Sequence, residues 1–157
     1  MPFAKFVQNL LSPILITSIL VSPTLVSTVE AKQPTKTAQC LVNLDNAKNQ
    51  GERDTKLLKE LNRCDVVLII DKRYNSNRGK DKYAITGFSR LNAKQILSVG
   101  IIVSKSDFDN KKIQSFDLEH SVWETVNWKS TLPDETSIPY QSLKQSVTTY
   151  VDLNLNK

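Results

Sequence analysis

From Asp65 onward the chain is a succession of short β-branched segments separated by turn signals, and this pattern limits the fold more than any other feature. The runs 65–70, 83–88 and 98–103 have the length and composition of strands. Short loops rather than long helices join them, which favours an antiparallel sheet over a parallel one. The sequence therefore predicts a mainly antiparallel β-sheet in this part of the chain.

The C-terminal third is predicted to add to the same sheet. Residues 113–128 alternate with a period of two over a stretch longer than an ordinary strand, so we expect a bulge or a break inside it. Residues 131–139 contain two prolines and are predicted to form a loop. We expect a short helix over 140–146 and a final strand over 147–155, where apolar and polar residues alternate again.

Before Cys64 the pattern is helical. Leu41, Leu44 and Ala47 share one stripe of a predicted helix over 38–48. The turn signal 49–51 follows.

A second helix is predicted to be capped by Asp54 and to end at Arg63, with Leu57, Leu58 and Leu61 on its inner face. Two consecutive helices joined by a short turn indicate a helical hairpin.

The two cysteines lie at positions that such a hairpin would bring together. Cys40 is near the start of the first predicted helix and Cys64 is at the end of the second. In an oxidising compartment an isolated pair of this kind forms a disulfide, and closing the loop stabilises the fold by about 3 kcal/mol. The predicted fold class is therefore α+β, with a disulfide-stapled N-terminal helical hairpin packed on a mainly antiparallel β-sheet.

Residues 1–31 have the pattern of a secretory signal peptide. Lys5 precedes an apolar run, and Val29-Glu30-Ala31 ends in residues that a signal peptidase accepts. A retained membrane anchor is the alternative, but Pro13 and Pro23 interrupt the run, and a spanning helix needs about 20 apolar residues. We expect a secreted or periplasmic protein without stable membrane insertion after cleavage.

Removing the signal peptide leaves a flexible tail over residues 32–39 and a single α+β domain over residues 40–157. The formal net charge of the chain is +5. Basic residues outnumber acidic ones between 48 and 90. This half of the chain is therefore the candidate for contact with an anionic partner.

The segment 71–83 is the strongest candidate for a binding site in the sequence. Its candidate residues combine cations with an aromatic ring: Lys72, Arg73, Tyr74, Arg78, Lys80 and Lys82. Guanidinium groups donate forked hydrogen bonds to anions and aromatic rings stack, so this loop favours an anionic polymer or an acidic protein surface as partner. The alternative is a solvated hairpin tip whose charges keep a sheet edge soluble.

The chain has few residues suited to catalysis. His120 is the only histidine, and strand alternation places it on the opposite face from Glu119. The sequence has no zinc-ligand spacing and no phosphate-binding glycine loop, so we expect no cofactor and no metal, and assign no catalytic residue.

The leading hypothesis is an exported binding or interaction protein without enzymatic activity. One alternative is a small secreted hydrolase or nuclease that uses carboxylates with His120. The other is a secreted enzyme inhibitor.

Overall fold

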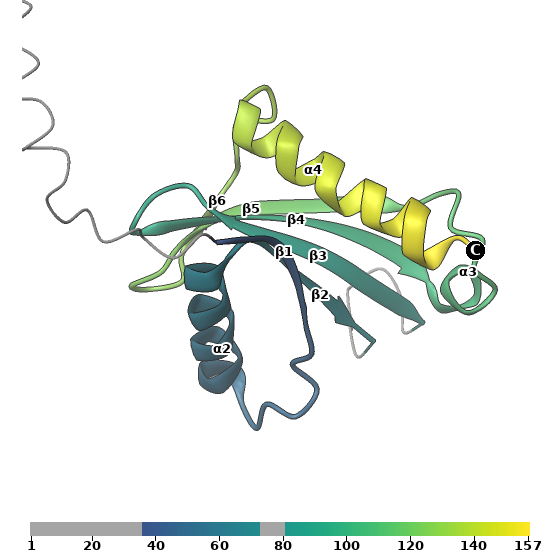
Figure 1. The fold of residues 1–157 in the computed structure, drawn as a ribbon, viewed down its shortest axis with the longest axis horizontal. Coiled ribbons are helices and arrows are strands. Elements are labelled where there is room, and N and C mark those ends of the chain that lie inside the picture. Colours follow the sequence, from purple (N-terminus) through teal and green to yellow (C-terminus); the bar gives the residue numbers. More distant parts are fainter. Residues whose placement is uncertain (1–35, 73–80) are drawn as a thin grey trace, which may run out of the picture. The chain divides into compact units, whose positions relative to one another are not determined.

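A six-stranded sheet forms the centre of the fold (Figure 1). In the computed structural model, which describes residues 36–72 and 81–157, the strands follow one another across the sheet in chain order. They are β1 Thr37–Val42, β2 Cys64–Asp71, β3 Lys82–Arg90, β4 Gln95–Ser104, β5 Asp117–Glu124 and β6 Ser130–Thr131. β1 pairs parallel with β2, and each of the other pairings is antiparallel. The fold of the described residues is thus a mixed α+β fold.

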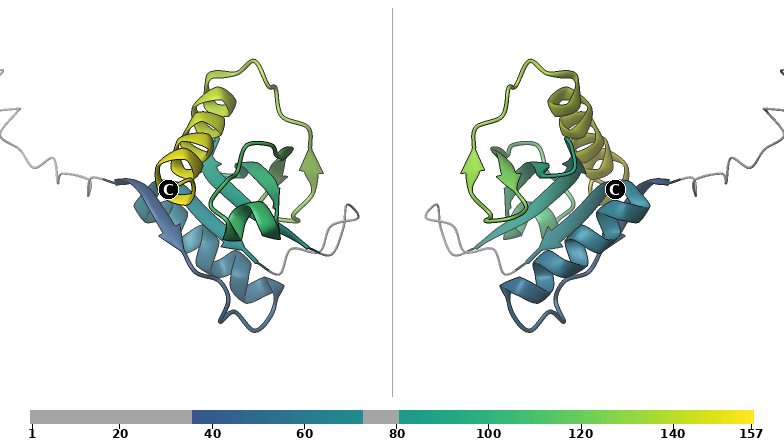
Figure 2. Two further views of the ribbon diagram at one scale, coloured as in Figure 1. Left: turned by 90° about the vertical axis from the view of Figure 1, so that its right-hand side faces the viewer. Right: turned by 90° about the vertical axis from the view of Figure 1, so that its left-hand side faces the viewer.

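Helices cover the two faces of this sheet. α2 (Gln50–Arg63) connects β1 to β2, and the short α3 (Lys105–Asp109) follows β4. α4 (Ile138–Tyr150) continues into one π-helical turn, η1 (Val151–Leu155). Figures 1 and 2 show α2 on one face and α4 on the other.

The two long helices, α2 and α4, pack on different hydrophobic clusters. The cluster under α4 is built around Leu68, Ile85, Val99 and Leu143, all with at most 1 % of their surface exposed. The cluster under α2 is smaller and includes Leu57, Leu61, Val67 and Ile96. Because α2 is amphipathic with few buried residues, it covers less of its face than α4 does, and part of the sheet beneath it is open to a groove.

The predicted helical hairpin is wrong. Residues 37–42 form the strand β1 instead of a helix, and Thr37 to Gln39 belong to this strand although the sequence places them in a flexible tail. The parallel register pairs Gln39 with Val66 and Leu41 with Leu68, so the segment gains backbone hydrogen bonds along β2 that no local pattern reveals. A single helix, α2, remains on this face.

α2 also begins earlier than predicted. The side chain of Asn49 accepts a hydrogen bond from the backbone N–H of Glu52, and the Glu52 carboxylate accepts one from the N–H of Lys48. The first bond satisfies an N–H group that the helix start leaves without an intrahelical partner, and the second fixes the residue before the cap, so the cap is Asn49 rather than Asp54. The helix does end at Arg63.

The predicted final strand over 147–155 is wrong, because those residues continue α4 and form η1. Ser137 caps α4 by accepting from the N–H of Tyr140, and the helix then presents Tyr140, Leu143 and Val147 to the core. These positions are three and four residues apart, the spacing of a helical face. Packing on the sheet therefore outweighs the β-branched composition of this segment.

The expected break in 113–128 is confirmed. β5 ends at Glu124, a turn follows, and β6 begins at Ser130. The N–H of Trp128 donates to the carbonyl of Glu124 over 2.7 Å and closes that turn.

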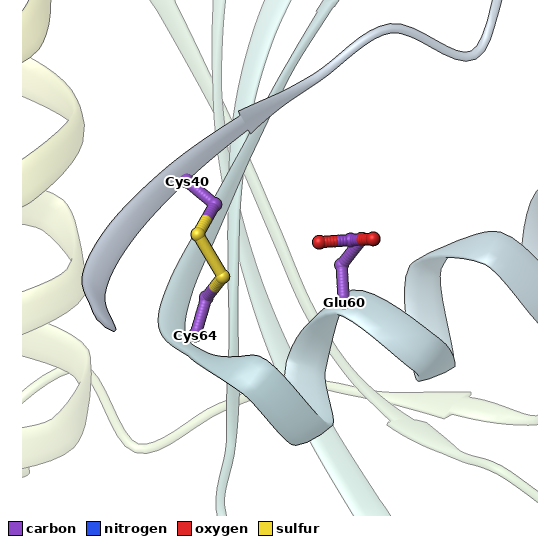
Figure 3. Close-up of side chains that lie close together, drawn as sticks. All are labelled: Cys40, Glu60 and Cys64. Carbon is purple, nitrogen blue, oxygen red and sulfur yellow. A yellow bond between two sulfur atoms is a disulfide. The ribbon is translucent and has the colours of Figure 1, made fainter. Parts of the chain in front are cut away.

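The predicted disulfide between Cys40 and Cys64 is confirmed, although not by the geometry expected. It joins β1 to the first residue of β2, with the two Cα atoms 6.0 Å apart (Figure 3). Glu60 of α2 lies beside it, and one ligand atom from each of the three side chains lies within 4.8 Å of the others. Because each sulfur is bonded to the other, this group offers no thiolate to a metal ion and acts as a covalent link between β1 and β2.

Candidate functional site

A cavity lies between α2 and the sheet, and we call it the α2 groove. It has a volume of about 610 Å³ and is lined by one stripe of α2 and by the facing side chains of β2 to β5. The α2 stripe consists of Gln50, Arg53, Asp54 and Leu57, which are spaced three and four residues apart. Leu44 and Trp128 close the groove from the neighbouring loops.

Small residues of β3 and β4 form part of the floor of the groove. Ala84, Ser98 and Gly100 all line it. One row across the sheet pairs Thr86 of β3 with Gly100 of β4, and a Cβ atom added at Gly100 would lie 3.0 Å from Oγ1 of Thr86. A glycine inside a strand is typical of places where another group approaches the backbone closely.

One end of the groove is aromatic. Phe88, Trp123 and Trp128 line it, and all three side chains are partly buried. The indole Nε1 of Trp123 donates to Oγ of Ser98 over 2.9 Å, and this hydroxyl in turn lies 3.4 Å from the carbonyl of Ser121. Trp128 has a backbone φ of 55°, which is uncommon for a residue with a bulky side chain.

Charged side chains line the groove toward the N-terminal end of α2. Nη2 of Arg53 lies 3.1 Å from Oδ2 of Asp71, and the two side chains are 24 % and 25 % exposed. The carboxylate of Asp54 accepts from the amide of Gln50 over 2.7 Å. The Arg53–Asp71 ion pair therefore links α2 to β2 across this end of the groove.

His120 turns its ring away from these groups. Its Nδ1 lies 2.9 Å from the hydroxyl of Tyr140, and its Nε2 lies 3.2 Å from Oε1 of Glu135. Both partners are on the α4 side, since Tyr140 belongs to the cluster under that helix. Burial, and secondarily the charge of Glu135, raise the pKa of Tyr140, so its hydroxyl keeps its proton at neutral pH within hydrogen-bond distance of His120.

This arrangement separates His120 from the groove carboxylates. Both Glu119 and His120 border the α2 groove, but the ring nitrogens of His120 contact Tyr140 and Glu135 on the α4 side. Tyr140 has 2 % of its surface exposed and has no route to a substrate. Within the described residues, His120 serves to hold the 131–137 loop and α4 against β5.

The basic loop is described only at its two ends. Lys72 is exposed, with Nζ 5.6 Å from the centre of the Phe108 ring, and Lys82 is half-buried at the start of β3. Arg73, Tyr74, Arg78 and Lys80 lie outside the described residues. The predicted anion-binding site over this loop stays a prediction.

Reading the sequence alone missed the α2 groove. Its lining comes from α2 and four strands, and only the pairing of those strands brings the residues together. Two signals pointed toward it: Gly100 inside a strand pattern, and two tryptophans five residues apart at the end of another.

Comparison with protein-family models, curated proteins and solved structures finds no match to this chain. Among residues 36–72 and 81–157, no helix is long and apolar enough to cross a membrane.

Proposed function

We propose that this protein is a non-enzymatic binding protein that takes a small, mainly apolar ligand into the α2 groove. The observation that carries the proposal is the groove itself: about 610 Å³, within the range of about 300 to 1,000 Å³ that is usual for small-molecule sites. Apolar atoms form most of its lining surface. Polar contacts come from hydroxyls, from the Arg53–Asp71 ion pair and from other polar side chains, which are Gln50, Asp54, Glu119 and His120.

The placement of the polar groups supports binding over catalysis. A general base must come within hydrogen-bond reach of the substrate proton that it removes. His120 is engaged with Tyr140 and Glu135 on the other side of the sheet, and Asp71 is engaged with Arg53. Both groups make contacts that hold the fold together, and most of the groove surface is apolar.

We further propose that the protein acts outside the cytoplasm, as a secreted or periplasmic protein. The signal-like pattern of residues 1–31 supports this location, and so does the disulfide between Cys40 and Cys64, because such bonds persist in oxidising compartments.

The test uses the full chain and 1-anilinonaphthalene-8-sulfonate, a dye that fluoresces in apolar sites. Both tryptophans of the chain line the groove, so binding is expected to raise dye fluorescence and to quench tryptophan emission together. Thr86→Phe places a ring on the groove floor and is expected to reduce dye affinity at least about tenfold, roughly 1.4 kcal/mol.

Thr131→Phe is the matched control, because Thr131 is exposed on β6 and does not line the groove. Its affinity for the dye should equal that of the unsubstituted protein. Circular dichroism verifies that both variants are folded. Absence of dye binding, or an equal loss in the two folded variants, would refute the groove as the site.

A further inference from the structure

The aromatic end of the α2 groove indicates the class of ligand. We propose that the ligand carries a planar aromatic ring, and that this ring packs against Trp123 and Trp128. This inference rests on the proposed function and specifies the chemistry of the same site.

Trp123 is held in place before any ligand arrives. Its indole has a single donor, Nε1, and that donor is already satisfied by the Ser98 hydroxyl at 2.9 Å. Ser98 is itself buried, with 7 % of its surface exposed, and its hydroxyl also contacts the carbonyl of Ser121. The indole is therefore anchored to β4, and its apolar ring, rather than a hydrogen-bond donor, is what it offers to the groove.

Trp128 reaches the same groove from a different element. It lies in the turn between β5 and β6, and its φ of 55° is a left-handed conformation that costs a non-glycine residue about 1 to 3 kcal/mol. The bond from its N–H to the Glu124 carbonyl holds that conformation. Backbone strain of this kind concentrates at ligand sites, and here it accompanies an indole in the groove wall.

Small residues and an aromatic side chain form the groove lining next to these rings. Ser98 and Gly100 present short side chains or none, and Phe88 adds a third aromatic side chain. Thr86 and Ser121 are half-buried and line the groove with hydroxyls that can bond a polar substituent at the edge of a ring. Aromatic pairs contribute affinity beyond the area they bury, so an aromatic ligand gains more here than a saturated one of similar size.

The experiment compares 2-naphthol with decahydro-2-naphthol, which share a carbon skeleton and one hydroxyl but differ in aromaticity. Equilibrium dialysis against the full chain measures both affinities without relying on fluorescence. We expect 2-naphthol to bind about threefold to tenfold more tightly than its saturated counterpart.

Two substitutions at one position separate stacking from volume. Trp123→Phe keeps an aromatic ring and should retain the preference for 2-naphthol, whereas Trp123→Leu should reduce that preference, with Trp128 still in place. Circular dichroism checks the folding of both variants, and the Phe variant keeps the test informative if the Leu variant does not fold.

The outcomes distinguish this inference from the function on which it rests. Equal affinity of the unsubstituted protein for the two compounds, or a preference for the saturated one, overturns the aromatic ligand class and leaves the apolar groove standing. If the protein binds neither compound, both the aromatic ligand class and the proposed binding function are overturned. A preference of undiminished size in a folded Trp123→Leu variant refutes the role given to Trp123.

Discussion

The hydroxyl of Tyr140 lies 2.9 Å from Nδ1 of His120, and the two rings meet edge to face with their centres 5.4 Å apart. This contact joins α4 to β5 through side chains twenty positions apart in the chain. The second ring nitrogen of His120 contacts Glu135 in the loop before α4. The histidine is thereby placed in the structural framework, with its ring nitrogens on the α4 side.

The pH dependence of stability should reveal the Tyr140 contact. Burial raises the pKa of Tyr140 above its ordinary value of 10.0, so the folded protein keeps this proton to higher pH than the unfolded chain does. The stabilisation is therefore complete below about pH 10 and is lost as the pH rises through the folded-state pKa. Replacing Tyr140 by Phe should destabilise the protein by about 1 kcal/mol at pH 8.

Urea unfolding of the unsubstituted protein and of Tyr140→Phe between pH 8 and pH 12 checks this. The difference in unfolding free energy between the two proteins removes the contribution of the other tyrosines, which titrate in both. This difference should shrink above pH 10. A difference that stays constant over this range would show that the buried hydroxyl does not titrate as argued.

Gly87 should be intolerant of any side chain. A Cβ atom at this position would lie 2.5 Å from Cγ2 of Val147 and 3.0 Å from Cδ1 of Leu143, both in the core under α4. Gly87→Ala should therefore lower the free energy of unfolding by about 1 to 3 kcal/mol, because α4 must move away from β3.

Gly51→Ala is the matched comparison for Gly87. Its added Cβ would make only an ordinary contact, 3.4 Å from Oδ1 of Asn49, and alanine favours the helix in which it lies. We expect Gly51→Ala to leave stability unchanged or to increase it, as judged by denaturation midpoints. If Gly87→Ala and Gly51→Ala lose equal stability, the close packing of α4 on β3 does not explain the loss in Gly87→Ala.

Loss of the disulfide should weaken the whole domain. The bond closes a loop with a sequence separation of 24, which corresponds to about 3 kcal/mol in the chain-entropy account. The double variant Cys40→Ala, Cys64→Ala should have a free energy of unfolding lower by about 3 kcal/mol, as measured by urea denaturation. Adding a reductant to the unsubstituted protein should shift its unfolding midpoint toward that of the double variant. A midpoint insensitive to both treatments would contradict this stabilising role.

The basic loop leads to a prediction that rests on the sequence. If Arg78 and Lys80 bind an anionic polymer, replacing both by Ala should lower the salt concentration at which the protein elutes from a heparin column. Lys59 and Arg63, which are exposed on α2, give a control pair with the same change of charge. Equal shifts for the two pairs would mean that net charge, and not this loop, governs retention.

Several parts of the fold were predictable because their signals are local. The β-branched runs 65–70, 83–88 and 98–103 lie within β2, β3 and β4, since a strand with a buried face needs such residues along its own length. Strand alternation also predicted opposite faces for Glu119 and His120, and the register confirms this, because His120 pairs with Val99 of the cluster under α4 and Glu119 pairs with Gly100.

Other elements were decided only by partners distant in the chain. Residues 37–42 carry a helix-like spacing of leucines, yet they form β1 because β2 supplies a row of backbone hydrogen-bond partners. Residues 147–155 alternate like a strand, yet Val147 and Val151 extend a helical face that begins at Tyr140, because the sheet buries that face.

The sequence by itself determined which segments could form strands, that Cys40 and Cys64 are bonded, and which face His120 occupies. Only the tertiary structure decided that β1 joins the sheet, that the C-terminus is helical, and that two tryptophans line one groove. The reason is physical: periodicity along a chain reports the burial of one face, but pairing and cavities depend on which segments meet across the folded molecule.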